Sequence, residues 1–223
     1  MNRAEILALR TYRSIKEELA SIKERDPAAT SGLEVALLYS GFHAVLAYRV
    51  AHILHTHGHV LGARVISQGA KFLTGIEIHP GAKIGRRLVI DHGMGIVIGE
   101  TAEIGDDCLI YHGVTLGGTG KDSGKRHPTI GNNVLIGTGA KVLGPFKVGD
   151  NSRIAANSVV LSEIPPDSTA VGIPARVVRR QGVKVDYATE VDQVNISDPV
   201  AEELAAIRKA LCEMNTRLQN MEK

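Results

Sequence analysis

Aliphatic side chains recur at every sixth residue through the middle of the chain. The series slips by two residues once and is interrupted once, and its members are Ile78, Ile84, Ile90, Ile96, Ile98, Ile104, Ile110, Leu116, Ile130, Ile136, Val142, Val148, Ile154 and Val160. A hexapeptide repeat of this kind is typical of a parallel β-helix, in which each repeat makes one flat strand and a turn and the aliphatic side chain points inward. The pattern therefore predicts a β-helix over residues 76–180.

The interruption of the repeat predicts an extruded loop. After Leu116 the series would place its next member at Asp122, but the next member is Ile130, so eight residues must leave the coil within the segment 117–129. Loops of this kind commonly carry binding or catalytic residues. The segment is therefore a candidate part of a functional site.

Residues 1–75 have the composition of helices, with many Leu, Ala, Arg and His residues and few glycines. Ser31 followed by Glu34 predicts a capping box at the start of a helix. Helical spacing then continues through Val35, Leu38, Phe42, Val45 and Arg49. The pair Asp26 and Pro27 looks like another helix N-cap followed by proline at the first helical position. These signals predict a helical N-terminal domain.

The end of the chain carries a second period, with apolar residues alternately four and three apart. They are Val200, Leu204, Ile207, Leu211, Met214, Leu218 and Met221. This spacing predicts a heptad helix over 196–223 after a linker at 181–195, and a parallel three-stranded coiled coil would suit triangular prisms. The alternative is one amphipathic helix that lies on its own domain. The predicted fold class is therefore α+β, with a helical domain, a β-helix and a C-terminal helix.

Composition limits the expected partners and the cellular compartment of the protein. Lysine and arginine total 26 against 24 acidic residues, so a net charge of +2 gives no reason to expect a nucleic-acid or membrane partner. The N-terminal segment lacks the apolar core of a secretory signal, and Cys108 and Cys212 cannot form a disulfide framework. We therefore expect a cytoplasmic protein.

Several motifs resemble those of the serine acetyltransferases of the hexapeptide-repeat transferase superfamily. The residues that carry the resemblance are Asp26-Pro27, Gly41-Phe42-His43-Ala44, Ala47-Tyr48-Arg49, Ile78-His79-Pro80, Asp91-His92-Gly93, Val114-Thr115-Leu116-Gly117-Gly118-Thr119-Gly120, Arg126-His127-Pro128 and Gly172-Ile173-Pro174-Ala175-Arg176. The repeat by itself identifies only the superfamily, and the combination of these motifs is more specific. The resemblance implies a left-handed β-helix that transfers acetyl from acetyl-CoA to L-serine, the first step of cysteine biosynthesis from serine.

That reaction needs a base, because a serine hydroxyl is a poor nucleophile until its proton is removed. His92 is the candidate, since an imidazole titrates near neutral pH and can return the proton to the leaving thiolate. The family places a carboxylate fifteen residues before this histidine to fix its tautomer, and here that position holds Glu77 where many relatives have Asp. Glu77 could instead be a solvated residue at the domain junction.

For serine itself, the resemblance implies that Asp26 and Asp91 bind the ammonium group while Arg126 and His127 hold the carboxylate. The chemistry agrees, because a zwitterion needs anions at one end and a cation at the other, and arginine suits a carboxylate. Taken singly, Asp26 could be a helix cap, Asp91 a corner residue and Arg126 a loop charge.

The resemblance also places acetyl-CoA in a groove between neighbouring prisms. It implies an oxyanion donor at Gly118 and further contacts from Thr119, Thr138, Arg153 and Ala156, although small residues in a β-helix need no ligand to explain them. Transfer would be direct, because Cys108 precedes an inward position and Cys212 lies on an outer heptad position. No metal is expected.

Three other functions stay open at this point. A zinc enzyme like the β-helix carbonic anhydrases could use three of His79, His92, His112 and His127. A related acetyltransferase could act on a sugar or another small hydroxyl acceptor, and a scaffold without activity would not require the Asp-His and Arg-His pairs.

The resemblance finally implies partners. It indicates a homotrimer, with a dimer of trimers as the larger alternative, and inhibition by L-cysteine at the serine site. A C-terminal isoleucine often docks into O-acetylserine sulfhydrylase in this family, and this chain ends in Met221, Glu222 and Lys223 instead. That departure argues against the sulfhydrylase complex.

Overall fold

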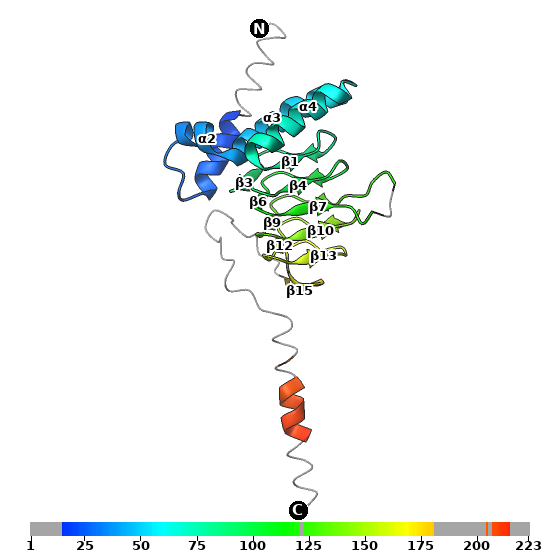
Figure 1. The fold of residues 1–223 in the computed structure, drawn as a ribbon. Helices are drawn as coiled ribbons and strands as arrows, with labels where there is room; N and C mark the ends of the chain where they lie inside the picture. The colour runs from blue at the N-terminus through cyan, green and yellow to red at the C-terminus, as the bar shows by residue number, and fades with distance from the viewer. Residues whose placement is uncertain (1–14, 121–122, 181–203, 205–206, 215–223) are drawn as a thin grey trace, which may run out of the picture.

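The computed structural model describes residues 15–120, 123–180, 204 and 207–214 (Figure 1). Residues 15–25 are helical and are followed by helices α2 (Gly32–Leu38), α3 (Ser40–Thr56) and α4 (Val60–Thr74). Gly75 ends α4 in a left-handed conformation with a φ of 72°, as is common at helix C-termini. The change from helices to strands therefore falls where the sequence composition changes.

The helical spacing from Val35 to Arg49 is divided between two helices, because the chain leaves helical geometry at Tyr39, and α2 and α3 meet at an angle of 71°. One local prediction in the helical part is wrong. Asp26 does not begin a helix, because it follows the helical residues 15–25 and its carboxylate accepts a hydrogen bond from the Ala28 N–H at 2.8 Å. It therefore closes a turn.

The cap of α2 is confirmed. The Ser31 hydroxyl accepts a hydrogen bond from the Glu34 N–H at 3.1 Å. The Glu34 carboxylate accepts one from the Thr30 N–H at 3.0 Å, one residue earlier than a capping box requires.

No single helix in the described ranges is long and apolar enough to cross a bilayer. Among the described helices, only α2 and α3 taken together, as a bent pair, have the length and apolar composition of a membrane span.

The rest of the described chain up to residue 180 winds into a parallel β-solenoid with three sheets, named A, B and C here. Sheet A contains β1 (Glu77–Ile78), β4 (Val97–Ile98), β7 (Thr115–Gly117), β10 (Lys141–Leu143) and β13 (Val159–Val160). Sheet B contains β2 (Lys83–Ile84), β5 (Glu103–Ile104), β8 (Thr129–Ile130) and β11 (Lys147–Val148). Sheet C contains β3 (Val89–Asp91), β6 (Leu109–Tyr111), β9 (Leu135–Ile136), β12 (Arg153–Ile154), β14 (Ser168–Gly172) and the antiparallel β15 (Ala175–Arg180), which ends the solenoid.

Strand register explains both irregularities of the repeat. Ile98 pairs with Leu116, which lies three six-residue repeats further along the chain. Leu116 pairs with Val142, which lies eight residues beyond the reach of three repeats, so the loop leaves the coil as the sequence predicts. The first coil is also long, since Ile78 pairs with Ile98 rather than with Ile96, and its two extra residues lie between Ile90 and Ile98. All fourteen aliphatic repeat residues are buried, with exposures of 9% or less.

The three faces of the solenoid differ because the residue before each inward aliphatic position points outward. On sheet C these residues include Val89, Leu109 and Leu135, which pack against the helical residues Ile22 and Val35. On sheet B they are the polar residues Lys83, Glu103, Thr129 and Lys147. On sheet A they are the mixed set Glu77, Val97, Thr115, Lys141 and Val159. Sheet C is thus covered by helices, and sheet B suits solvent.

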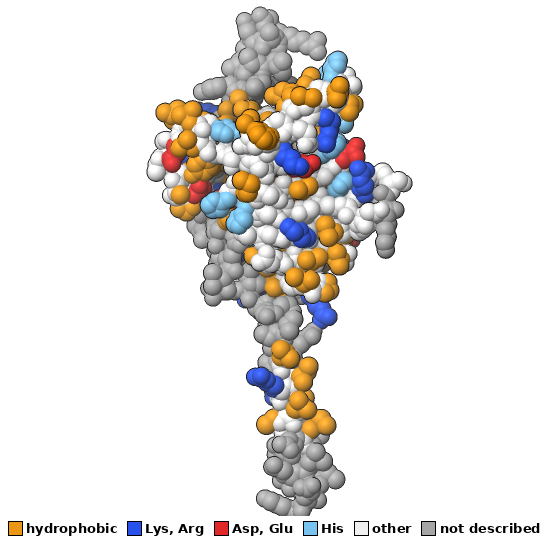
Figure 2. Space-filling model, viewed as in Figure 1, with side chains coloured by type: hydrophobic (Ala, Val, Ile, Leu, Met, Phe, Trp, Pro, Cys, Tyr) orange, Lys and Arg blue, Asp and Glu red, His pale blue; other side chains and the backbone are white. Residues whose placement is uncertain are grey.

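Apolar side chains also remain on helix surfaces, as the hydrophobic patches on the helical end and on the C-terminal helix show (Figure 2). Leu61, Phe72 and Leu73 of α4 are between 80% and 89% exposed. Residues 207–214 are helical, and Ile207, Leu211 and Met214 are between 55% and 60% exposed. The other heptad positions except Leu204, and the linker expected at 181–195, lie outside the described residues.

Candidate active site

His92 stands in the turn that leads from sheet C to sheet A, here called the C/A corner. This turn holds the two extra residues of the first coil. His92 has a φ of 57°, and its side chain is 75% exposed. The Ser40 hydroxyl at the start of α3 donates a hydrogen bond to the His92 carbonyl at 2.9 Å. The helical domain therefore fixes the backbone that presents the imidazole to solvent.

One carboxylate, Asp91, lies beside this imidazole, and a second, Asp26, lies near Asp91. The His92 Nε2 and Asp91 Oδ1 atoms are 3.8 Å apart. Burial raises the pKa of Asp91, and the charge of Asp26 raises it further, whereas His92 lowers it. The Tyr39 hydroxyl donates a hydrogen bond to Asp26 at 2.7 Å, which together with burial raises the pKa of Tyr39 to about 12. The structure thus gathers three of the predicted site residues, Asp26, Asp91 and His92, at one corner.

Further site candidates form a column along the same corner, one in each coil. Backbone N–H groups of Gly139 and Asn157 donate to the carbonyls of His112 and Thr138 at 2.9 Å and 2.7 Å, so His112, Thr138 and Ala156 are stacked in consecutive coils. Successive coils of a solenoid are about 4.8 Å apart. The column therefore runs away from the His92 corner in steps of roughly that length.

His112 is a residue that sequence reasoning considered only as a ligand of the alternative zinc site. Its ring meets the His92 ring edge to face with centroids 5.6 Å apart. Its Nδ1 is buried and has no hydrogen-bond partner in the described part of the chain. The repeat could have revealed it, because His112 follows Ile110 by two residues just as Thr138 follows Ile136.

Arg126 and His127 lie elsewhere, at the turn from sheet A to sheet B, called the A/B corner. The Arg126 guanidinium donates to the Glu100 carboxylate at 2.5 Å, which lowers the pKa of Glu100. The His127 side chain is buried, and burial followed by the charge of Arg126 lowers its pKa. The imidazole lies directly on Gly99, where an added Cβ would be 2.0 Å from the ring. This corner therefore offers a cation and a neutral imidazole side by side.

The remaining predicted residues divide between these places. Gly118 and Thr119 follow β7 at the A/B corner, and an added Cβ on Gly118 would lie 3.1 Å from the Arg126 carbonyl oxygen. Arg153 lies on β12 in sheet C. Glu77 begins β1, and the contact that its carboxylate makes is with Lys71 Nζ at 2.5 Å. A single chain therefore presents two groups of candidate residues on opposite edges of sheet A.

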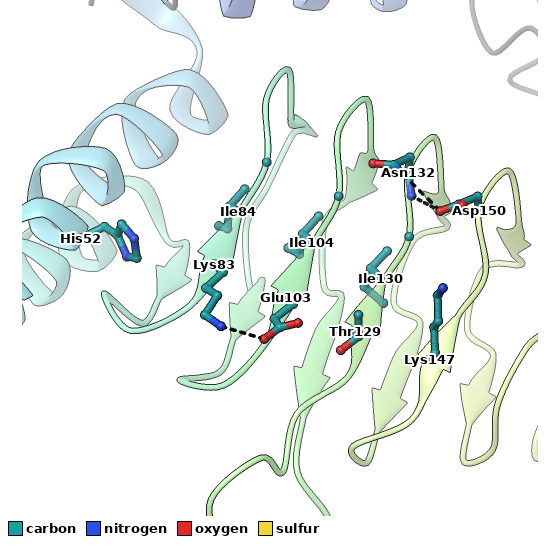
Figure 3. Close-up of a pocket in the computed structure, with 13 residues that line it drawn as sticks. His52, Lys83, Ile84, Glu103, Ile104, Thr129, Ile130, Asn132, Lys147 and Asp150 are labelled. Atoms are coloured by element: carbon teal, nitrogen blue, oxygen red, sulfur yellow. Dashed lines mark hydrogen bonds and ion pairs between the residues drawn. The ribbon is translucent and has the colours of Figure 1, made fainter. Parts of the chain in front are cut away.

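A groove on sheet B and the Cys108 thiol are separate from these two groups of candidate residues. A groove of about 510 Å³ on sheet B is lined by Lys83, Glu103, Thr129 and Lys147, with His52 at one end, and contains no predicted site residue (Figure 3). The Lys83 and Glu103 side chains are paired there at 3.1 Å. Within the described ranges, no three His, Cys, Asp or Glu side chains are placed to hold a metal ion. Cys108 is buried, and burial raises its pKa to about 12, which is unfavourable for a thiolate nucleophile.

Comparison with known proteins gives consistent matches. Residues 127–162 match the family model described as bacterial transferase hexapeptide (six repeats). The serine acetyltransferase of Bacillus subtilis is 51% identical over 209 residues, which cover 94% of this chain and 95% of the relative. The structure of Neisseria gonorrhoeae serine acetyltransferase in complex with serine matches with a TM-score of 0.74 at 42% identity, over 77% of this chain and 70% of that one. That of Brucella abortus serine acetyltransferase in complex with coenzyme A matches with a TM-score of 0.75 at 43% identity, over 77% of this chain and 68% of that one.

Proposed function

The chain belongs to the serine acetyltransferase family, and on that premise we propose that it transfers the acetyl group of acetyl-CoA to the hydroxyl of L-serine at a site built around His92. The observation that carries the assignment is the C/A corner. It combines an exposed imidazole with two carboxylates and stands at one end of the column formed by His112, Thr138 and Ala156.

Electrostatics at this corner favour an amino acid as the acceptor. Asp26 and Asp91 are close enough for one charge to raise the pKa of the other. Two neighbouring carboxylates destabilise each other, and an ammonium group between them relieves that repulsion. The serine ammonium is such a group, whereas an uncharged sugar acceptor would leave the two acids unpaired.

The other end of serine is an anion, and the A/B corner suits it. Arg126 is always charged and can grip a carboxylate through two hydrogen bonds. His127 is kept neutral by burial and by Arg126, so it can donate one hydrogen bond without adding charge. We assign the serine carboxylate to this pair.

The chemical step follows from these placements. His92 removes the proton of the serine hydroxyl as the oxygen attacks the acetyl carbonyl, and it returns the proton to the departing thiolate of CoA. Glu77 is assigned to hold the imidazole tautomer, and the Gly118 N–H to stabilise the oxyanion. Acetyl-CoA is assigned to the groove that includes Thr119, Thr138, Ala156 and Arg153. No covalent acyl-enzyme is required.

Each of the two groups of candidate residues forms half of a site, and both half-sites are used if protomers associate through sheet A. This sheet is flanked by the C/A and A/B corners, and its outer row combines apolar and polar side chains, with Val97 37% exposed. In a cyclic trimer each C/A corner can meet the A/B corner of the next protomer, because every heterologous contact is repeated until the ring closes. We propose this homotrimer as the active unit, with the C-terminal heptads as a second contact along the same axis.

The test is acetyl-CoA-dependent thiol release by the purified full chain. L-serine is compared with homoserine, a galactoside and no acceptor, and we expect release that depends on L-serine. Release only with the galactoside would replace the serine assignment with a sugar acetyltransferase. Release with no acceptor preference would refute both.

A further inference from the structure

The base of the extruded loop is held by one residue outside the predicted site. Thr101 lies one coil before the loop at the A/B corner. Its hydroxyl oxygen accepts hydrogen bonds from the backbone N–H groups of Arg126 and His127 at 3.0 Å and 3.1 Å. The Thr101 carbonyl accepts another from Lys125 Nζ at 2.7 Å. Three consecutive residues at the return of the loop are therefore fastened to a single threonine.

The same threonine also fixes the His127 ring. The Thr101 hydroxyl is 2.8 Å from His127 Nδ1, and the Thr101 N–H donates to the same nitrogen at 3.2 Å. A hydroxyl has one proton and two lone pairs. Because both lone pairs are used by the two backbone N–H groups, the proton is directed at Nδ1.

This arrangement determines the tautomer of His127. Nδ1 accepts hydrogen bonds from the Thr101 N–H and the Thr101 hydroxyl. A proton on Nδ1 would point at these two donors, so in the neutral ring the proton is on Nε2. Nε2 is the atom that can donate to a ligand. Gly99 leaves the space under the ring, since its added Cβ would lie 2.1 Å from Nε2.

We propose that Thr101 is a positioning residue for serine binding, which fixes the loop return and holds His127 as the Nε2–H donor to the serine carboxylate. This inference rests on the proposed function for its kinetic consequence, although the tautomer can be observed without turnover. Glu100 supports the same corner by pairing with Arg126.

The variant that isolates this role is Thr101→Val, which keeps the side-chain shape and removes the hydroxyl. We expect KM for serine to rise about tenfold, from the loss of three hydrogen bonds at the corner. KM for acetyl-CoA should stay within about twofold, because the hydroxyl acts on the serine end of the site. Thr101→Ser keeps the hydroxyl and should restore the wild-type KM for serine. Thr56→Val, at an exposed position of α3, is the matched control.

The pH dependence gives a readout that simple loosening of the fold would not change. The charged groups that act on the His127 ring are Arg126, Glu100 and Lys125. Loss of the hydroxyl donor removes one group that opposes protonation of Nδ1, so the pKa of the His127 ring should rise, and the midpoint of its titration, followed by nitrogen NMR, should move to higher pH in Thr101→Val. Thr101→Ser and Thr56→Val should keep the wild-type profile.

Nitrogen NMR of histidine-labelled full chain tests the tautomer directly. We expect an Nε2–H signal pattern for His127 in the wild type, identified by its absence in His127→Gln, and a mixed or charged ring in Thr101→Val. An Nδ1–H tautomer in the wild type would overturn the proposal, as would equal rises in both KM values. If the wild type shows the Nε2–H tautomer but no serine-dependent thiol release, the proposed function fails and the placement of His127 stands.

Discussion

His92 combines exposure with an unusual backbone. A φ of 57° is uncommon for a residue with a side chain and costs roughly 1 kcal/mol or more, and turn residues such as Asn157 in the described solenoid share it. The two residues added to this turn widen the corner, and the Ser40 hydroxyl holds its carbonyl. The repeat thus departs from regularity at the residue that carries the proposed chemistry.

His92→Asn tests the base with the least disturbance, because asparagine tolerates a left-handed backbone. We expect kcat to fall by about 10²- to 10⁴-fold, the usual contribution of a general base. KM for both substrates and the melting temperature should change little, since the side chain is 75% exposed. His57→Asn, at an exposed position, is the control. A kcat within twofold of wild type would remove His92 from the mechanism.

Glu77 has two competing explanations that one pair of variants separates. If it orients His92, Glu77→Gln should lower kcat about tenfold or more with KM unchanged, and Lys71→Met should leave kcat unchanged. If its role is only the pair with Lys71 at 2.5 Å, both variants should alter the melting temperature alike and neither should affect kcat. We expect the first result, because Glu77 is the residue of β1 nearest the C/A corner.

At the scale of elements, the repeat predicted far more than the helical signals did. An aliphatic residue at every sixth position indicates the inward side chain and, where the series is unbroken, the strand register, so Ile98 pairs with Leu116 and Val142 with Val160 as the spacing requires. Helical periodicity is compatible with either one helix or two across Tyr39. The bend there depends on tertiary packing, which a local pattern does not contain.

The contact between α3 and the solenoid depends on a glycine. An added Cβ on Gly41 would lie 2.2 Å from the Ile90 carbonyl oxygen, two residues before His92. Gly41→Ala should therefore push α3 away from the C/A corner, lower the free energy of unfolding by about 1–3 kcal/mol and reduce kcat.

Gly69→Ala is the matched control for Gly41→Ala. Gly69 is also helical, and an added Cβ there meets nothing within 4 Å. Its substitution should raise stability by up to about 1 kcal/mol, because alanine favours the helix. Urea unfolding measures both variants. Equal effects would show that the close approach at Gly41 carries no cost.

At the scale of the whole molecule, sequence reasoning named site residues but could not say which of them one chain brings together. Asp26 and Asp91 meet although 65 positions separate them in the sequence. Arg126 is closer to His92 along the chain, yet it lies at another corner because the coil passes along sheet A between them. Repeat phase assigns a residue to a corner, and association between protomers is needed to join two corners.

Subunit complementation tests that association. His92→Asn and Arg126→Ala should each be inactive alone, the second through loss of serine affinity. Suppose that each site combines the C/A corner of one protomer with the A/B corner of the next. The Arg126→Ala chain then supplies an intact His92 and the His92→Asn chain supplies an intact Arg126. A site is intact in a mixed trimer where these two residues face each other. Every mixed cyclic trimer has one intact site of three, whichever variant is present twice, so the isolated mixed trimers should show roughly a third of wild-type activity. Co-expression with two different tags and tandem purification isolates the mixed oligomers, and mixing the two purified variants without subunit exchange is the control. Mixed oligomers that stay inactive would mean that both half-sites act within one protomer or that sheet A does not join them.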